Sequence, residues 1–163
     1  MKRWCCLIFL FLLIGCATTT PLVGPDGGDY KVHTDRHLKI QLPVPSGWSV
    51  SSSKTPFPTL RVQMGGTEAS AGLTVFLNPN AISAAEVHKD LLAARKSPPK
   101  QAIEGRVDGR QALGFRDSAN GKTATAFVVD HDRGIYVIVM KATTPQEQAT
   151  LDFIFARIRL LED

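Results

Sequence analysis

Tight-turn signals divide the second half of the chain into four runs of strand-forming residues. The pairs Asp108-Gly109 and Asn120-Gly121 contain residues that tolerate the positive φ angles of two-residue hairpin turns, and a longer polar loop is expected at Asp130–Gly134. Strands joined by such short turns pair with each other in antiparallel fashion. The sequence therefore predicts a four-stranded meander, with strands at about 102–107, 110–116, 123–129 and 135–142.

The last of these runs, IYVIVMKA, is apolar at both sets of alternating positions. Successive side chains of a strand point to opposite faces of the sheet, so one set faces each side. A strand with this pattern is covered on both faces. The two sets are Ile135, Val137 and Val139 on one side and Tyr136, Ile138 and Met140 on the other.

Two capping motifs predict helices before and after the meander. Ser83 with Glu86 forms a capping box, and Thr144 with Glu147 forms another, with Pro145 at the first turn. Pro98-Pro99 ends the first helix. Apolar residues at helical spacing predict a buried stripe on each helix. These stripes are Ala84, Val87, Leu91 and Ala94 in the first helix, and Leu151, Ile154, Phe155 and Ile158 in the second.

The first half of the domain has the same alternation over shorter stretches. Strands are expected from Leu38 to Leu42 and from Trp48 to Val50, joined by a turn at 45–47 into an opening hairpin. Two further strands are expected at 60–64 and 72–77. Together with the helices, this pattern predicts an α+β domain that begins at about Tyr30.

The first residues have the layout of an export signal. Lys2 and Arg3 precede the unbroken apolar run Cys5–Ile14, and Gly15 and Cys16 follow it. A membrane-spanning helix needs roughly 20 apolar residues, so this run is too short to be one. The segment TTTPLVGPDGGD at 18–29 is rich in Thr, Pro and Gly and predicts a flexible tether.

The residues Leu13-Ile14-Gly15-Cys16 resemble the lipobox of bacterial lipoproteins. That resemblance implies a signal peptide at 1–15, a diacylated Cys16 as the first mature residue, a tether at 16–29 and a folded domain at 30–163. Membrane lipid is then a partner through Cys16. Ala17, in place of an aspartate, implies the outer membrane of an organism that has one, with the domain facing the periplasm. The alternative is an ordinary secretory signal with a chance cysteine.

Charge gives no support to a nucleic-acid partner, and cysteine content excludes disulfide bonds in the folded domain. The chain has 19 Lys and Arg, of which Lys2 and Arg3 leave with the signal, so 17 remain against 15 Asp and Glu. A net charge of +2 gives no support to a nucleic-acid partner. All three cysteines lie at or before Cys16, so the domain has no disulfide and depends on its core.

The turn from Pro45 to Trp48, the doubly apolar strand at Ile135 and the closing helix through Leu161 resemble the PsbP-like fold. That resemblance implies a single domain with an antiparallel sheet packed between helices. Members of the family are mostly non-enzymatic accessory or binding proteins, and the fold brings no catalytic motif with it.

No established catalytic, cofactor-binding or metal-binding motif occurs in the chain, so no cofactor is expected. His33 and His37 have the spacing of a helical zinc pair, but along a predicted strand four residues span roughly 13 Å, too far for one metal. The loop Asp130-His131-Asp132 contains possible acid–base or metal-binding groups, although a solvated turn is the simpler interpretation.

A basic run with Arg95, Lys96 and Lys100 could contact anionic lipid or glycan, or complement the helix dipole. The sequence therefore predicts a membrane-anchored envelope lipoprotein that binds a protein partner of an envelope assembly without catalysis. Two alternatives remain. One is an envelope hydrolase using Asp130, His131 or Asp132, and the other is a small-ligand-binding module with a pocket between the sheet and a helix.

Overall fold

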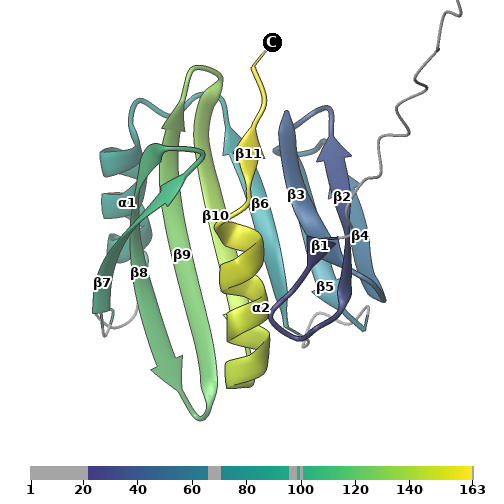
Figure 1. Ribbon diagram of the computed structural model, residues 1–163. Coiled ribbons are helices and arrows are strands. Elements are labelled where there is room, and N and C mark those ends of the chain that lie inside the picture. The colour runs from purple at the N-terminus through teal and green to yellow at the C-terminus, as the bar shows by residue number, and fades with distance from the viewer. Residues whose placement is uncertain (1–21, 66–70, 96–98, 100, 163) are drawn as a thin grey trace, which may run out of the picture.

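The computed structural model describes residues 22–65, 71–95, 99 and 101–162. The predicted signal, lipobox, Cys16 and the first part of the tether lie outside the described residues, as do Lys96 and Lys100 of the basic run. Two antiparallel sheets and two helices make up the described part (Figure 1), which confirms the predicted α+β class. No described helix is long and apolar enough to cross a membrane.

The larger sheet has seven strands in the order β4-β5-β6-β10-β9-β8-β7. Its strands are β4 (Trp48–Ser53), β5 (Thr59–Met64), β6 (Gly72–Asn78), β7 (Gln101–Val107), β8 (Arg110–Ala119), β9 (Lys122–His131) and β10 (Gly134–Ala142). The smaller sheet has the order β1-β2-β3-β11, with β1 (Leu22–Val23), β2 (Asp29–Asp35), β3 (Ile40–Pro45) and β11 (Arg159–Leu160).

The predicted meander is confirmed as β7, β8, β9 and β10, each paired with the next. Asp108 and Gly109 have φ angles of 50° and 79°, and Asn120 and Gly121 have 52° and 73°. Both turns thus use the positive φ that Asn, Asp and Gly tolerate. The third connection is tighter than expected, because β9 continues to His131, which pairs with Gly134.

The predicted opening hairpin is wrong. β3 and β4 are consecutive, but β3 pairs with β2 and β11 in the smaller sheet, whereas β4 pairs with β5 in the larger one. Between them the chain turns at Gly47, which has a φ of 85°, and passes from one sheet to the other. Period-two alternation identifies a strand and its buried face, but it does not identify the neighbouring strand.

The described structure begins before Tyr30, inside the segment predicted as a tether. Leu22 and Val23 form β1 and pair with Tyr30 and Asp29 of β2. A carboxylate oxygen of Asp26 accepts hydrogen bonds from the Gly28 N–H at 3.1 Å and from the Tyr30 hydroxyl at 3.4 Å. Leu22 also packs against the main core, so these contacts hold the segment as a turn before β2.

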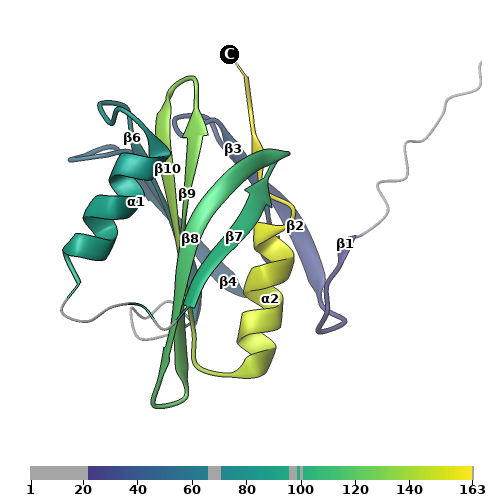
Figure 2. The same cartoon turned by 90° about the vertical axis from the view of Figure 1, so that its left-hand side faces the viewer.

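The helices are α1 (Ala84–Ala93) and α2 (Pro145–Phe155), and they lie on different faces of the larger sheet (Figure 2). Both predicted caps are present, since the Ser83 and Thr144 side chains accept from the N–H groups of Glu86 and Glu147. The reciprocal half of the box is present at α2, where Glu147 accepts from the Thr144 N–H at 3.0 Å.

The main core lies between the larger sheet, α2 and the smaller sheet. Tyr136, Ile138 and Met140 of β10 are buried in it, together with Leu151 and Ile154 of α2. On the other face of β10, Ile135 and Val137 pack with Ala84, Val87 and Leu91 of α1. The prediction that β10 is covered on both faces is therefore confirmed for these residues. Of the predicted stripes, Ala94 is exposed, Phe155 is half-buried, and Ile158 is buried beyond the end of α2.

The short strand β11 was not predicted, and a carboxylate explains its position. Asp108, in the turn between β7 and β8, accepts a hydrogen bond from the Leu160 N–H at 3.1 Å and pairs with Arg159 at 2.6 Å. Burial alone raises the pKa of Asp108, but its bonds from Arg159 and Leu160 outweigh burial, so the pKa lies below its ordinary value.

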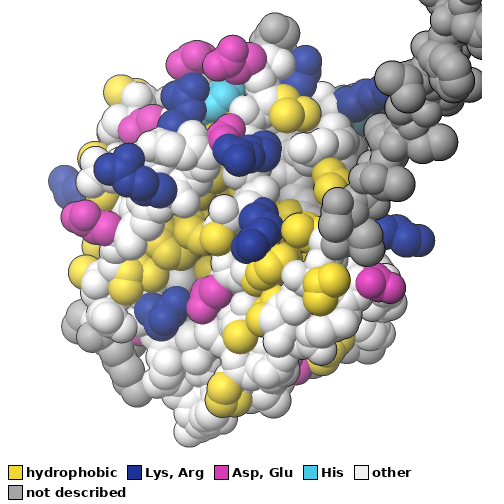
Figure 3. All heavy atoms as spheres, in the orientation of Figure 1, with side chains coloured by type: hydrophobic (Ala, Val, Ile, Leu, Met, Phe, Trp, Pro, Cys, Tyr) yellow, Lys and Arg dark blue, Asp and Glu magenta, His cyan; other side chains and the backbone are white. Residues whose placement is uncertain are grey.

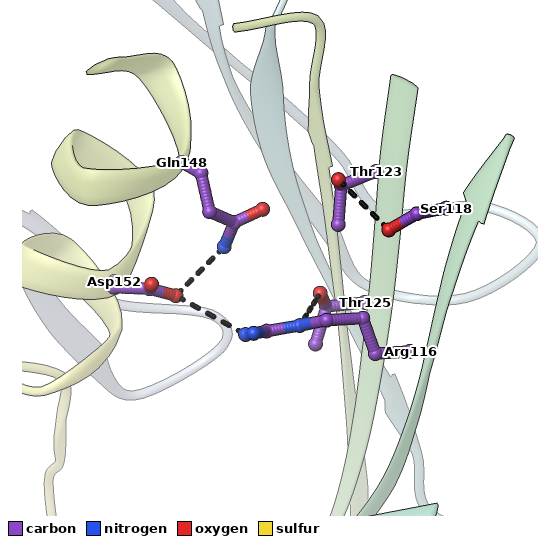
Figure 4. A network of polar contacts seen from close by, with 6 residues as sticks. All are labelled: Arg116, Ser118, Thr123, Thr125, Gln148 and Asp152. Carbon is purple, nitrogen blue, oxygen red and sulfur yellow. Dashed lines mark hydrogen bonds and ion pairs between the residues drawn. The ribbon is translucent and has the colours of Figure 1, made fainter. Parts of the chain in front are cut away.

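A polar network joins α2 to the meander (Figure 4). Arg116 of β8 donates to the Thr125 hydroxyl at 3.1 Å and lies 3.7 Å from the Asp152 carboxylate, which also accepts from Gln148 at 2.8 Å. The Ser118 and Thr123 hydroxyls are 3.2 Å apart near the turn. Because Asp152 is half exposed, the ion pair adds little stability and mainly orients α2.

Candidate functional site: a groove on the outer face of the larger sheet

We call the face of the larger sheet that carries α1 the outer face. In the described part of the chain, α1 packs over β8, β9 and β10, and β4 and β5 lie toward the opposite edge of the sheet (Figure 1). The strand pairing identifies the side chains that β4, β5, β6 and β10 present on this face, of which Val137 packs against α1. Row by row across the strands they are Ser53, Thr59, Phe76 and Val137, then Ser51, Arg61, Thr74 and Val139, then Ser49, Gln63, Gly72 and Lys141.

Two adjoining hollows form a groove on this part of the outer face. The first has a volume of about 360 Å³ and is lined by Arg61, Gln63, Gly72, Thr74, Phe76, Val139 and Lys141. The second has a volume of about 340 Å³ and is lined by Ser51, Ser52, Ser53, Thr55, Pro56, Phe57, Thr59, Arg61 and Phe76. Arg61 and Phe76 line both hollows, so the two lie next to each other, and we call them together the groove.

The floor of the groove is kept open by a glycine. A Cβ at Gly72 would lie 2.8 Å from the carbonyl oxygen of Val62, so a side chain at this position requires the backbone to move. Gly72 lies between Gln63 and Lys141 in the register. The strands therefore leave a bare stretch of backbone there, with the longer side chains of Gln63 and Lys141 on either side.

The chemical character of the groove is that of a binding surface for a polar or anionic group with an apolar part. Hydroxyl and amide groups line it, Arg61 and Lys141 carry positive charge, and the half-buried Phe76 ring supplies apolar surface. Among the described residues that line either hollow there is no Asp or Glu. The groove lies on the face opposite α2, so Figure 3, which shows the α2 side, does not display it.

In the predicted loop Asp130-His131-Asp132, the side chains of Asp130 and His131 lie on opposite faces of β9. Asp130 and His131 belong to β9, and only Asp132 and Arg133 form the turn to β10. The Asp130 carboxylate accepts a hydrogen bond from the Ala84 N–H at 2.8 Å and so caps the first turn of α1. Asp132 is exposed. None of the three lines the groove.

The cap at Asp130 changes what is expected of the loop. Asp130→Ala should lower the free energy of unfolding by about 0.5–2 kcal/mol, because the Ala84 N–H loses its acceptor at the start of α1. Asp132→Ala is the matched control, since it removes the same group two residues away at an exposed turn, and it should change stability very little. Urea unfolding of both variants measures the difference, and equal effects would contradict the cap.

His131, the last residue of β9, is partly buried. Its ring meets Tyr136 edge-on at a centroid distance of 5.5 Å, and its Nδ1 accepts a hydrogen bond from the Arg133 N–H at 3.3 Å. The Nε2 atom is buried without a partner among the described residues. Burial lowers the pKa of His131, and the positive charge of Arg110 lowers it further.

This shift predicts a pH dependence of stability. The unfolded state binds a proton at His131 more readily than the folded state. The free energy of unfolding is therefore highest above the unfolded pKa of about 6.5 and decreases as the pH falls toward the folded pKa. His131→Gln should flatten the curve of unfolding free energy against pH in this window. If the substitution leaves the slope unchanged, the pH dependence of stability comes from other groups.

The prediction that His33 and His37 lie along one strand is wrong. His33 is on β2 opposite Leu42, whereas His37 is in the turn before β3. The His37 N–H donates to the Asp35 carboxylate at 2.9 Å, and its carbonyl accepts from Arg133 at 3.4 Å. Among the described residues no group of three possible metal ligands occurs.

Arg95, the described member of the basic run, has a local role. It forms an ion pair with Asp117 of β8, and its guanidinium lies 4.7 Å from the centre of the Phe115 ring. These contacts hold the end of α1 against the meander. An interaction of Lys96 and Lys100 with anionic lipid or glycan stays a prediction.

No family model matches the chain, and no curated protein matches it either. Among solved structures, the chain is similar to the solution structure of a cyanobacterial PsbP, CyanoP from Synechocystis. The TM-score is 0.58 at 10% identity, over 90% of this chain and 98% of that one. This likeness shows the fold alone, and at that level it confirms the predicted PsbP-like fold.

Two further solved structures are similar to this chain. A crystal structure from Bacteroides thetaiotaomicron has a TM-score of 0.56 at 8% identity over 87% of this chain, which spans 50% of the length of that one. LpqN of Mycobacterium tuberculosis, a protein involved in cell envelope biogenesis, has 19% identity over 88% of this chain and 90% of that one. Its TM-score of 0.38 is too low to indicate a shared fold.

Proposed function

We propose that this chain is a lipid-anchored protein of the cell envelope that acts by binding a protein partner through the groove, without catalysis. The observation that carries the proposal is the open half of the outer face. It combines two adjoining hollows, hydrogen-bonding side chains, an aromatic ring and positive charge on the strands β4, β5, β6 and β10. A concave surface of this kind is the default location for binding.

The placement of the Asp130 and His131 side chains on opposite faces of β9 favours binding over hydrolysis. A hydrolase built on them needs an acid, a base and a substrate at one point. Here Asp130 is engaged with α1, and His131 packs against Tyr136. The small-ligand alternative places a pocket between the sheet and a helix. It is not favoured, because no described residue of either helix lines the two hollows.

The anchor in this proposal is the lipobox cysteine, and the first described strand, β1, follows it closely in the sequence. Covalent geometry limits the path from Cys16 to Leu22 to roughly 20 Å at full extension. An acylated Cys16 therefore keeps β1 and the edge of the smaller sheet near the headgroups. The binding surface is then presented to partners in or near the same membrane.

Site-specific photo-crosslinking in intact envelopes tests this function. A photoreactive residue in place of Thr74, in the groove, should give one crosslinked protein of defined mass. The same residue in place of Lys31, exposed on β2 of the smaller sheet, is the matched control and should not give that product. Equal products from both positions, or none from the groove, would contradict the proposed function.

A further inference from the structure

The edge strand β4 differs from the other edge of the same sheet. Among the described strands, β4 pairs with β5 alone, so its other hydrogen-bonding edge has no partner strand there. The β4 sequence WSVSSS contains no charged residue and no proline. At the opposite edge, β7 carries Glu104 and Arg106 with Gly105 between them. Charges and irregularities of this kind protect an edge from pairing with other chains, so β7 is protected and β4 is not.

We propose that β4 binds an extended, acidic segment of the partner protein, which adds to the larger sheet as a further strand. This inference rests on the proposed function and specifies the class of partner. Backbone hydrogen bonds along an added strand supply affinity, and pockets that accept its alternate side chains supply specificity. The structure offers both features side by side.

The second hollow of the groove is the pocket that such a strand requires. It runs along Ser51, Ser52 and Ser53 of β4 and continues to Phe57, which is 44% exposed. A strand paired with β4 projects every second side chain over the outer face. Those side chains lie beside the hollow and beside the apolar surface of Phe57.

The charge next to β4 selects acidic side chains. Lys54 directly follows the strand, and Lys141 lies farther along the groove. No acidic residue occurs on β4 or among the described residues that line the groove. A second copy of this chain brings the same positive charges to the interface, so charge complementarity favours a different, acidic partner.

Fluorescence anisotropy with defined peptides tests the inference on the full-length acylated protein in detergent micelles. The probes are a labelled peptide of alternating Val and Asp, and the same peptide with Lys in place of Asp. The acidic peptide should bind at least about tenfold more tightly than the basic one. Backbone N-methylation of the acidic peptide should abolish binding, because it removes hydrogen-bond donors and leaves the charge unchanged.

Matched variants locate the binding on the protein. Lys54→Glu should weaken binding of the acidic peptide by at least about tenfold, whereas Arg106→Glu makes the same charge change on β7 and should leave binding unchanged. Equal loss in both variants, equal binding of the basic peptide, or full binding of the N-methylated peptide would overturn the inference. Efficient disulfide-linked dimers of a Ser52→Cys variant would overturn it as well and identify a second copy as the occupant. Crosslinking at Thr74 without peptide binding would leave the proposed function standing.

Discussion

Replacing Ile154 by alanine is expected to lower the free energy of unfolding by about 2–5 kcal/mol, a large share of the roughly 5–15 kcal/mol that stabilises a typical domain. Ile154 is 0% exposed and lies in the core between α2, the larger sheet and the smaller sheet. Truncation leaves a cavity at the point where these layers meet, and close-packed neighbours relax only partly into it. Urea unfolding of the domain measures the change.

Two neighbouring residues are the controls for this experiment. Phe155 is half-buried and stacks on Phe127 at 4.2 Å, so Phe155→Ala should cost less than the loss of a fully buried aromatic side chain. Asp152→Ala removes only a partly exposed ion pair and its bond from Gln148, and should cost less than about 1 kcal/mol. An effect of Ile154→Ala as small as that of Asp152→Ala would mean that α2 does not pack on the sheet as described.

The meander could be predicted from the sequence because its information is local. Each turn pair lies between the two strands that it joins, so Asp108-Gly109 and Asn120-Gly121 specify both the turn and the pairing. The helix caps are local as well, since Ser83 and Thr144 act within three residues of themselves. Elements of this kind need no knowledge of distant contacts.

The smaller sheet could not be predicted because its pairing depends on distant residues. In β2 only Tyr30 and Asp35 are buried, so the strand has no period-two signal. β11 has two residues, and its position depends on β3 and on Asp108, far away in the sequence. The residues around Gly47 predict a hairpin of β3 and β4, but this turn leads from one sheet to the other because β3 pairs with β2.

The groove carries no sequence motif, for the same reason. Its side chains come from four strands and from the segment at 55–57, and those of the strands meet only through the register of the larger sheet. The uncharged run at 49–53 and Gly72 are the local signals that could have directed attention there. The segment Asp130-His131-Asp132 is recognisable from the sequence because its residues are adjacent. The capping role of Asp130 depends on the position of α1 beside β9.

Cys16→Ser is expected to abolish lipid attachment altogether. The thiol of Cys16 is the atom that takes the diacylglyceryl group in a lipobox, and a single acyl chain holds a protein at a membrane only marginally. The variant should accumulate as an uncleaved precursor, and the native protein should partition into detergent with an acylated Cys16 at its amino terminus, as mass spectrometry can establish. The domain should unfold at the same urea concentration in both, since Cys16 lies before the first described residue, Leu22. A variant with an ordinary cleavable signal is the matched control and should be released without lipid. A native protein that begins after Cys16 and carries no lipid would contradict both the anchor and the proposed position at the envelope membrane.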